Sequence, residues 1–123
     1  MSRFLWVALG GALGAVLRYA VSLIPVRGGF PVLTLLTNLL GALLIGFIAG
    51  AAEISAPSPG LILFAKTGLC GGFTTFSTFS LESLGLLRRG RLLMGGAYML
   101  LSAALCLAGV ALGLRMSQII SRV

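Results

Sequence analysis

The sequence predicts an all-α membrane protein with four transmembrane helices, the third of them broken near its middle. Of the 123 residues, 59% are hydrophobic and only 9% are charged, whereas soluble domains contain about 25% charged residues. The apolar residues form four windows of about 20 residues, the length that a helix needs to cross a bilayer core. Segments of about 10 alternating residues, typical of membrane β-barrels, are absent from the sequence. We therefore expect one four-helix domain over residues 1–123, with spans at about 4–24, 32–52, 61–81 and 92–114.

Each window carries two glycines four residues apart, a pattern that lets helix backbones approach closely in a membrane. The pairs are Gly10/Gly14, Gly46/Gly50, Gly68/Gly72 and Gly109/Gly113. They predict a tightly packed bundle. Because the chain has 18 glycines, chance is an alternative source for some of these pairs. The first window also lacks the cleavage site of a signal peptide, so it is expected to remain as a span.

The second and fourth windows place polar side chains along one helix face. Thr34 and Asn38 are four residues apart in the second window, and Tyr98, Ser102 and Cys106 follow the same spacing in the fourth. Polar groups inside a membrane are costly and often functional. The alternatives are an interhelical hydrogen bond from Asn38 and an interfacial anchoring role for Tyr98.

The third window contains the stretch GGFTTFSTFSLE at 71–82. Gly71 and Gly72 each weaken a helix by roughly 1 kcal/mol relative to alanine. A broken helix exposes amide dipoles and free carbonyls that suit ion binding. Phenylalanine rings alternate with the hydroxyl residues that follow, and a ring edge carries weak positive charge. Simple helix packing is the alternative role for these rings.

The few acidic residues favour an anion over a cation as the ligand of these polar groups. Glu53 and Glu82 both lie at predicted span ends, whereas cation pathways and proton relays usually have a buried acid. The polar groups within the spans are mostly donors, with Arg18 near one mouth. Cys70 and Cys106 lack CxxC spacing and the chain has no histidine, so both are interpreted as small packing residues. No nucleophile–base pair or metal-ligand cluster is present in the sequence, so no enzyme is predicted.

The basic residues divide almost evenly between the two membrane sides. One side carries Arg3, Arg115 and Arg122, and also Lys66 if its side chain snorkels back to the near interface. The other carries Arg27, Arg88, Arg89 and Arg91, and also Arg18 if its side chain reaches the far end of its helix. The positive-inside rule requires an imbalance, so we expect insertion in both orientations and an antiparallel dual-topology dimer about a two-fold axis in the membrane plane. A miscount of a few charges near span ends is the alternative. The net charge of +7 is scattered at these ends and does not predict nucleic-acid binding.

Three blocks in register resemble the small bacterial fluoride channels, the Fluc or CrcB family: GGALGAVLRY at 10–19, TNLLGALLIG at 37–46 and, above all, GGFTTFSTFSLE at 71–82. The resemblance implies a homodimer of antiparallel subunits in membrane lipid, with two narrow fluoride pores. It also implies passive release of fluoride from the cytoplasm across the bacterial plasma (inner) membrane, and hence resistance to fluoride toxicity.

The resemblance assigns roles to individual residues. Phe76 and Phe79 are expected to contact fluoride by their ring edges, and Asn38 to donate a hydrogen bond to it. The backbone carbonyls of Gly71 and Thr74 are expected to bind a structural Na⁺ at the dimer centre. The remaining implied residues are the mouth arginine Arg18, the polar-track residues Tyr98 and Ser102 with Thr34 on the Asn38 face, and the pore-mouth residues Ser77, Thr78 and Glu82. Cys106 departs from the family pattern, which has a hydroxyl there, so the track is expected to be thinner.

Three alternatives remain beside this reading. A small multidrug-resistance exporter also has four spans and dual topology, but it needs an acid in its first span, and 4–24 contains none. A second alternative is an assembly subunit without transport, in which glycines and hydroxyls only pack. Some members of the fluoride channel family pair two different subunits of fixed orientation. The even charge count favours one self-pairing chain.

Overall fold

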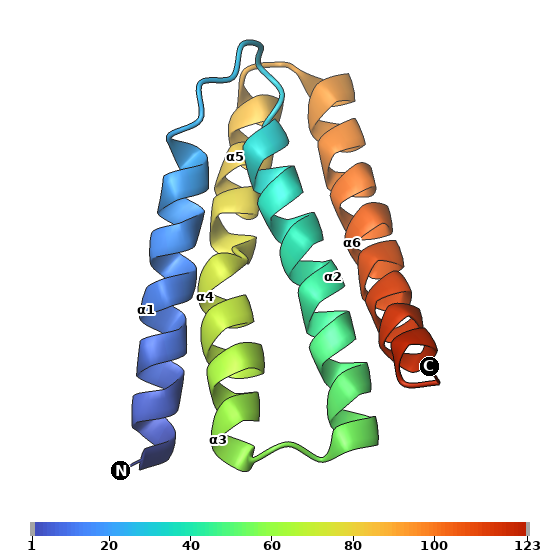
Figure 1. The fold of residues 1–123 in the computed structure, drawn as a ribbon. Helices are drawn as coiled ribbons and strands as arrows, with labels where there is room; N and C mark the ends of the chain where they lie inside the picture. The colour runs from blue at the N-terminus through green and yellow to red at the C-terminus, as the bar shows by residue number, and fades with distance from the viewer. Residues whose placement is uncertain (1, 123) are drawn as a thin grey trace.

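The computed structural model describes residues 2–122, and all regular structure within them is helical. Three long helices are α1 (Ser2–Ser22), α2 (Val32–Ser55) and α6 (Leu92–Ile120), each long and apolar enough to cross a membrane. A fourth rod, between α1 and α2 in the view of Figure 1, is built from several pieces. The all-helical prediction with an interrupted third span is confirmed.

The pieces of this broken rod, residues 59–88, follow one another along nearly the same line (Figure 1). They are α3 (Pro59–Ile62), the π-helix η1 (Leu63–Cys70), α4 (Gly71–Phe73) and α5 (Phe76–Arg88). The rod is therefore longer than the expected span 61–81. A hydropathy window marks only the most apolar stretch of about 20 residues, whereas a helix continues until its backbone turns away, here at Gly90 with φ +76°.

The interruption lies at Thr74 and Thr75, which are extended (φ −81°, ψ 156° and φ −148°, ψ 113°). We expected the preceding glycines to weaken the helix at this point. Gly71 is instead helical, with φ −64° and ψ −38°, and Gly72 lies in α4. The glycines and the break are thus neighbouring features with different causes.

The glycines of the broken rod pack against α1. A Cβ atom at Gly14 would overlap the carbonyl oxygen of Leu69, and one at Gly72 would overlap that of Gly11. Gly10 and Gly68 approach each other in the same way. Close backbone approach therefore explains why these positions carry no side chain.

Glycines also allow the backbones of α2 and α6 to pack closely together. A Cβ atom at Gly46 would overlap the carbonyl oxygen of Val110, and one at Gly113 would overlap that of Leu43. The bundle therefore consists of two glycine-packed helix pairs, α1 with the broken rod and α2 with α6. Each predicted glycine pair lies at one of these two interfaces.

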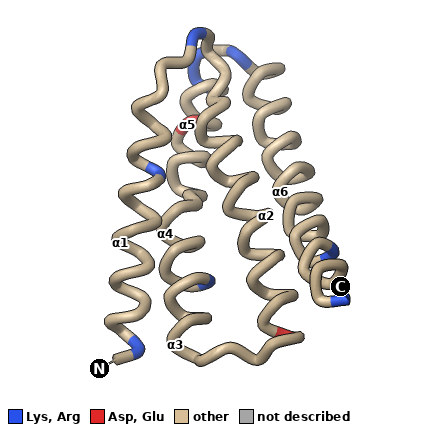
Figure 2. The backbone as a smooth tube through the Cα atoms, viewed as in Figure 1, with Lys and Arg blue, Asp and Glu red and all other residues tan. Residues whose placement is uncertain are grey.

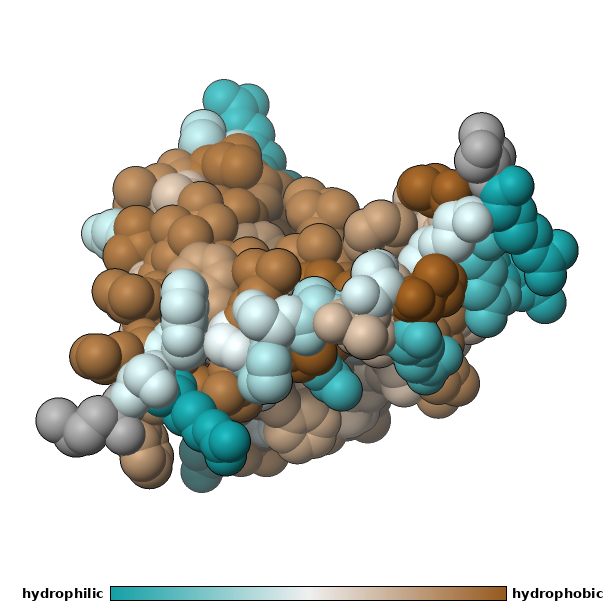
Figure 3. Space-filling view, turned by 60° about the horizontal axis from the view of Figure 1, so that its bottom comes forward, coloured by the Kyte–Doolittle hydropathy of each residue, from teal (hydrophilic) through white to brown (hydrophobic). Residues whose placement is uncertain are grey.

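Much of the apolar surface remains uncovered in a single chain. Leu93 is 89% exposed and Phe76 is 79% exposed. Apolar side chains cover much of the face in Figure 3, and hydrophilic residues gather near the chain termini. Lysine and arginine lie mainly toward the two ends of the bundle (Figure 2). This distribution fits helices that cross a membrane.

Candidate functional site

The side chain of Asn38 holds the interruption of the broken rod. The backbone N–H of Thr75 donates to Asn38 Oδ1 at 2.7 Å, and Asn38 Nδ2 donates to the carbonyl oxygen of Thr75 at 3.1 Å. The carboxamide thus supplies both partners that a helix would otherwise provide to this residue. Because Nδ2 carries two N–H groups, one donor of Asn38 is left for another acceptor.

The side chain of Thr75 begins the next helix. Its Oγ1 accepts a hydrogen bond from the backbone N–H of Thr78 at 3.2 Å and donates to Thr78 Oγ1 at 3.0 Å. This is an N-cap, which satisfies one of the free amides at the start of α5. Thr75 was not among the site residues predicted from the sequence. A threonine just before a new helical segment is the signal that identifies it.

The hydrogen bonds of Asn38 and of the Thr75 hydroxyl leave two backbone carbonyl groups without their usual helical donors. In a continuous α-helix, the amides of Thr75 and Thr78 would bind the carbonyls of Gly71 and Thr74. Here those amides bind Asn38 and the Thr75 hydroxyl instead. The predicted sodium-binding carbonyls are therefore among those whose helical donors bind elsewhere at the break. The carbonyl of Gly72 between them accepts from Arg18 Nε at 3.1 Å.

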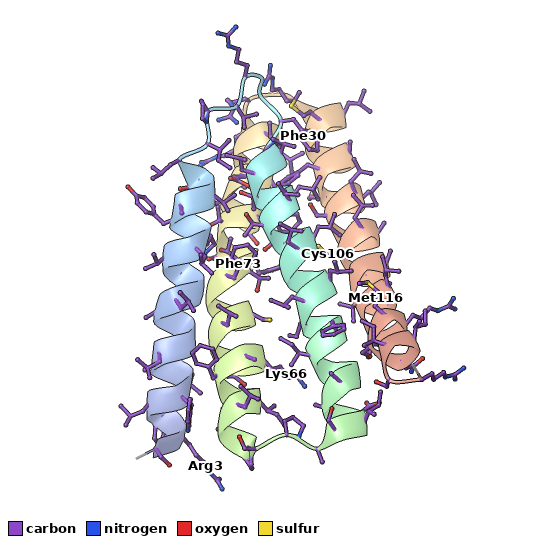
Figure 4. All side chains as sticks on the ribbon, in the orientation of Figure 1. Arg3, Phe30, Lys66, Phe73, Cys106 and Met116 are labelled. Atoms are coloured by element: carbon purple, nitrogen blue, oxygen red, sulfur yellow. The ribbon has the colours of Figure 1, made fainter. Side chains whose placement is uncertain are left out.

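A cavity of about 630 Å³, the large cavity, opens between the broken rod, α2 and α6. Seven residues selected from the sequence line it: Asn38, Gly71, Thr74, Phe76, Phe79, Ser102 and Cys106. The rings of Phe76 and Phe79 lie 5.4 Å apart with planes tilted by 41°. Residues from three distant parts of the chain therefore form one wall of rings and polar groups. Figure 4 labels Cys106 on α6, on the far side of α2 from the broken rod in this view.

Ser102 is the least satisfied polar residue of the large cavity. Its Oγ is buried and has no hydrogen-bond partner among the described residues. A buried hydroxyl without a partner destabilises a protein by roughly 1–3 kcal/mol. Ser102 is therefore a candidate to donate to a ligand in the cavity. Cys106, one turn further along α6, offers only a weak S–H donor.

A second cavity of about 250 Å³, the small cavity, lies on the other side of the break. It is lined by Arg18, Ser22, Leu33, Thr34, Thr37, Thr75, Thr78 and Glu82. Thr75 lines both cavities. The selected residues thus fall into two groups that meet at the break, with four of them in the small cavity: Arg18, Thr34, Thr78 and Glu82.

Glu82 joins three helices rather than projecting freely into a mouth. Thr34 Oγ1 donates to Glu82 Oε1 at 2.8 Å, and the Tyr98 hydroxyl donates to Oε2 at 2.7 Å. Hydrogen bonds to a charged group contribute about 1.5–3 kcal/mol each. The carboxylate therefore fixes α2 and α6 relative to α5, next to the small cavity.

Tyr98 and Ser77 line neither cavity. Tyr98 is fully buried, and its ring lies 5.2 Å from that of Phe79 and 5.6 Å from that of Phe30. This burial excludes the interfacial-anchor alternative, and it places Tyr98 as a support behind Phe79. Ser77 is exposed, with its Oγ 3.3 Å from Thr75 Oγ1.

Comparison with known proteins gives one consistent family. Residues 5–114 match the family described as CrcB-like protein, Camphor Resistance (CrcB). A relative from Shewanella halifaxensis is 42% identical over 116 residues, covering 92% of this chain and 94% of the relative. Relatives from Methanococcus maripaludis and Flavobacterium psychrophilum are 46% and 45% identical, covering 92% and 93% of this chain and 93% and 95% of their own lengths. All three are named fluoride-specific ion channel FluC.

The N-cap at Thr75 is open to a direct test. We expect Thr75→Val to destabilise the protein by about 1 kcal/mol, because the backbone amide of Thr78 loses its acceptor. Thr75→Ser keeps the oxygen and is the matched control. Hydrogen exchange of the amides at 77–79, measured in detergent, should accelerate in the valine variant alone. Equal exchange in both variants would show that the cap is dispensable.

Proposed function

This chain belongs to the CrcB family, whose curated relatives are named fluoride channels, and we propose that two antiparallel copies form a passive channel with two fluoride pores. The channel resides in the bacterial inner membrane and lets fluoride leave the cytoplasm, which protects the cell from fluoride toxicity. It is a transporter and not an enzyme.

The large cavity is the observation that carries the proposal. Its wall combines one spare N–H of Asn38, the unpartnered hydroxyl of Ser102 and the rings of Phe76 and Phe79. Fluoride is small and strongly hydrated, so a dry path must replace its water with several modest donors. Amide, hydroxyl and ring edge are donors of this kind, and none of them is a fixed charge that would hold the ion tightly.

The exposure of Phe76 supports a dimer. A ring that is 79% exposed in one chain and lines an open cavity would meet lipid if the chain acted alone. A second copy on this face would enclose the cavity and place its own rings opposite. The even distribution of basic residues favours the antiparallel arrangement, in which the two-fold axis lies in the membrane plane.

The residues at the break fit a sodium ion on that axis. Hard cations prefer oxygen ligands, and broken helices supply them as unpaired backbone carbonyls. Gly71 and Thr74 each offer a carbonyl whose helical donor is bound elsewhere, so two copies would offer four oxygens. When bound, the cation would hold the two broken rods together at their interruptions. Within residues 2–122, no cluster of three or more His, Cys, Asp or Glu provides another metal site.

Glu82 has a structural part in this proposal. With both carboxylate oxygens engaged by hydroxyls, it fixes the position of Tyr98 behind Phe79. Arg18 lines the small cavity and binds the Gly72 carbonyl, so it both attracts anions to this mouth and ties α1 to the break. Proton-coupled transport requires an acid that gains and loses a proton as its partners change. Glu82 has no such role in the proposed channel, which works without proton coupling.

Fluoride release from liposomes tests the function. Protein-containing liposomes loaded with fluoride should release it down its gradient without ATP or a proton gradient, as followed with a fluoride electrode. Phe79→Ile should slow release by about tenfold, equivalent to roughly 1.4 kcal/mol in the barrier, while the dimer persists on sizing. Wild-type release at the rate of empty liposomes would refute the channel and favour the assembly-subunit alternative. Chloride release at a similar rate would refute selectivity.

The orientation of the subunits is testable in sealed vesicles. Both chain ends lie on the same side of a four-span bundle, so a protease-removable tag at the C-terminal end reports the orientation of its copy. An antiparallel homodimer predicts that about half of the tags are protected from external protease. Complete protection or complete removal would contradict dual topology.

Sodium removal tests the metal proposal separately. Replacing Na⁺ by a large organic cation on both sides should slow fluoride release, because the two interruptions lose their shared ligand. Restoring Na⁺ should restore the rate. Equal rates in both media, with active wild-type protein, would exclude a role for sodium in conduction.

A further inference from the structure

Lys66 is the one charged residue among those lining the large cavity. It belongs to η1, and Figure 4 shows its side chain reaching from the broken rod toward α2. α2 and α6 run antiparallel to the broken rod, so Lys66 shares one end of the cavity with Ile45 and Val110. Phe79, Asn38 and Ser102 lie at the other end.

Lys66 lies inside the third span, seven residues from the start of the rod at Pro59, and its side chain is exposed at the opening of the large cavity. A charged side chain inside a membrane span is costly and marks a candidate functional site. The carboxylates of the chain do not explain it: Glu82 is engaged by two hydroxyls, and Glu53 is exposed near the C-terminal end of α2.

The proposed two-fold axis near Gly71 and Thr74 relates depths in the two subunits. Lys66 precedes this axis along the broken rod, and Phe76 and Phe79 follow it. The symmetry turns each side of the axis in one subunit onto the opposite side in its partner. Lys66 of one subunit therefore lies on the same side of the membrane midplane as the partner's ring pair.

We propose that Lys66 is a fluoride-attracting residue at the end of the large cavity remote from Arg18. Its positive charge raises the local concentration of small anions beside the ring pair, and the ion then passes to the uncharged donors. Arg18 on α1 lines the small cavity and Lys66 on η1 lines the large cavity, so each side of the break has one cation. This inference rests on the proposed function and on the antiparallel dimer.

The test compares fluoride release by Lys66→Gln, Lys66→Arg and the control Arg115→Gln in liposomes of neutral lipid. Arg115 is exposed, belongs to α6 and lines neither cavity, so its removal changes the net charge equally. At about 10 mM salt, Lys66→Gln should release fluoride about threefold more slowly. This is the change in local fluoride concentration that a unit charge produces at a distance of about 7 Å in water. At about 1 M salt, where the Debye length is about 3 Å, its rate should match the wild type. Lys66→Arg and Arg115→Gln should be normal at both concentrations.

Each other outcome overturns the proposal in its own way. A wild-type rate for Lys66→Gln at low salt would show that the charge has no role. Equal slowing in Arg115→Gln would assign the effect to general surface charge, and equal slowing in Lys66→Arg would assign it to packing. An effect that appears only in vesicles with anionic lipid would assign Lys66 to a lipid headgroup. Lys66→Met, which keeps the apolar stem, replaces Lys66→Gln if the latter is not recovered as a dimer. A wild-type protein that releases no fluoride refutes the proposed function itself.

Discussion

The pairing of the Asn38 carboxamide with the backbone of Thr75 is the interaction on which the rest of the site depends. An interruption inside a membrane leaves amides and carbonyls without water, and each unsatisfied group is costly. Asn38 binds both the N–H and the C=O of Thr75, so the chain can remain extended there. Everything else follows from this support: the restart of the helix at Phe76, the two released carbonyls and the placement of both rings on the same short helix.

The helices could be predicted from the sequence because hydropathy and glycine spacing are local signals. The family resemblance predicted Phe76, Phe79, Asn38 and Ser102 as pore residues, and the structure brings them to one cavity. The predicted origin of the interruption was wrong. Gly71 has the conformational freedom to break a helix, but freedom does not specify a break, and the hydrogen bonds of Asn38 and Thr75 do.

The hydrogen bonds of Glu82 could not be predicted from the sequence, for a different reason. Its partners, Thr34 and Tyr98, come from helices 48 and 16 residues away, and no periodicity within one helix reveals a contact between helices. The Ser102 hydroxyl shows the same limit. A sequence reveals which residues are polar, but it does not reveal which buried polar groups have a hydrogen-bond partner. Functional candidates thus emerged where the packed chain leaves a polar group unused or diverts one from its usual partner.

The pairing of α1 with the broken rod also has a consequence for biogenesis. α1 contacts η1 and α4 far more than it contacts α2, although α2 is its neighbour in the sequence. During synthesis, which proceeds from the N-terminus, α1 enters the bilayer before its glycine-lined partner surface exists. The first two spans are therefore not an independent folding unit. The native packing of α1 forms only when residues 63–73 are inserted. Until then, α1 remains in the bilayer as a single apolar helix whose glycine-lined surface contacts lipid.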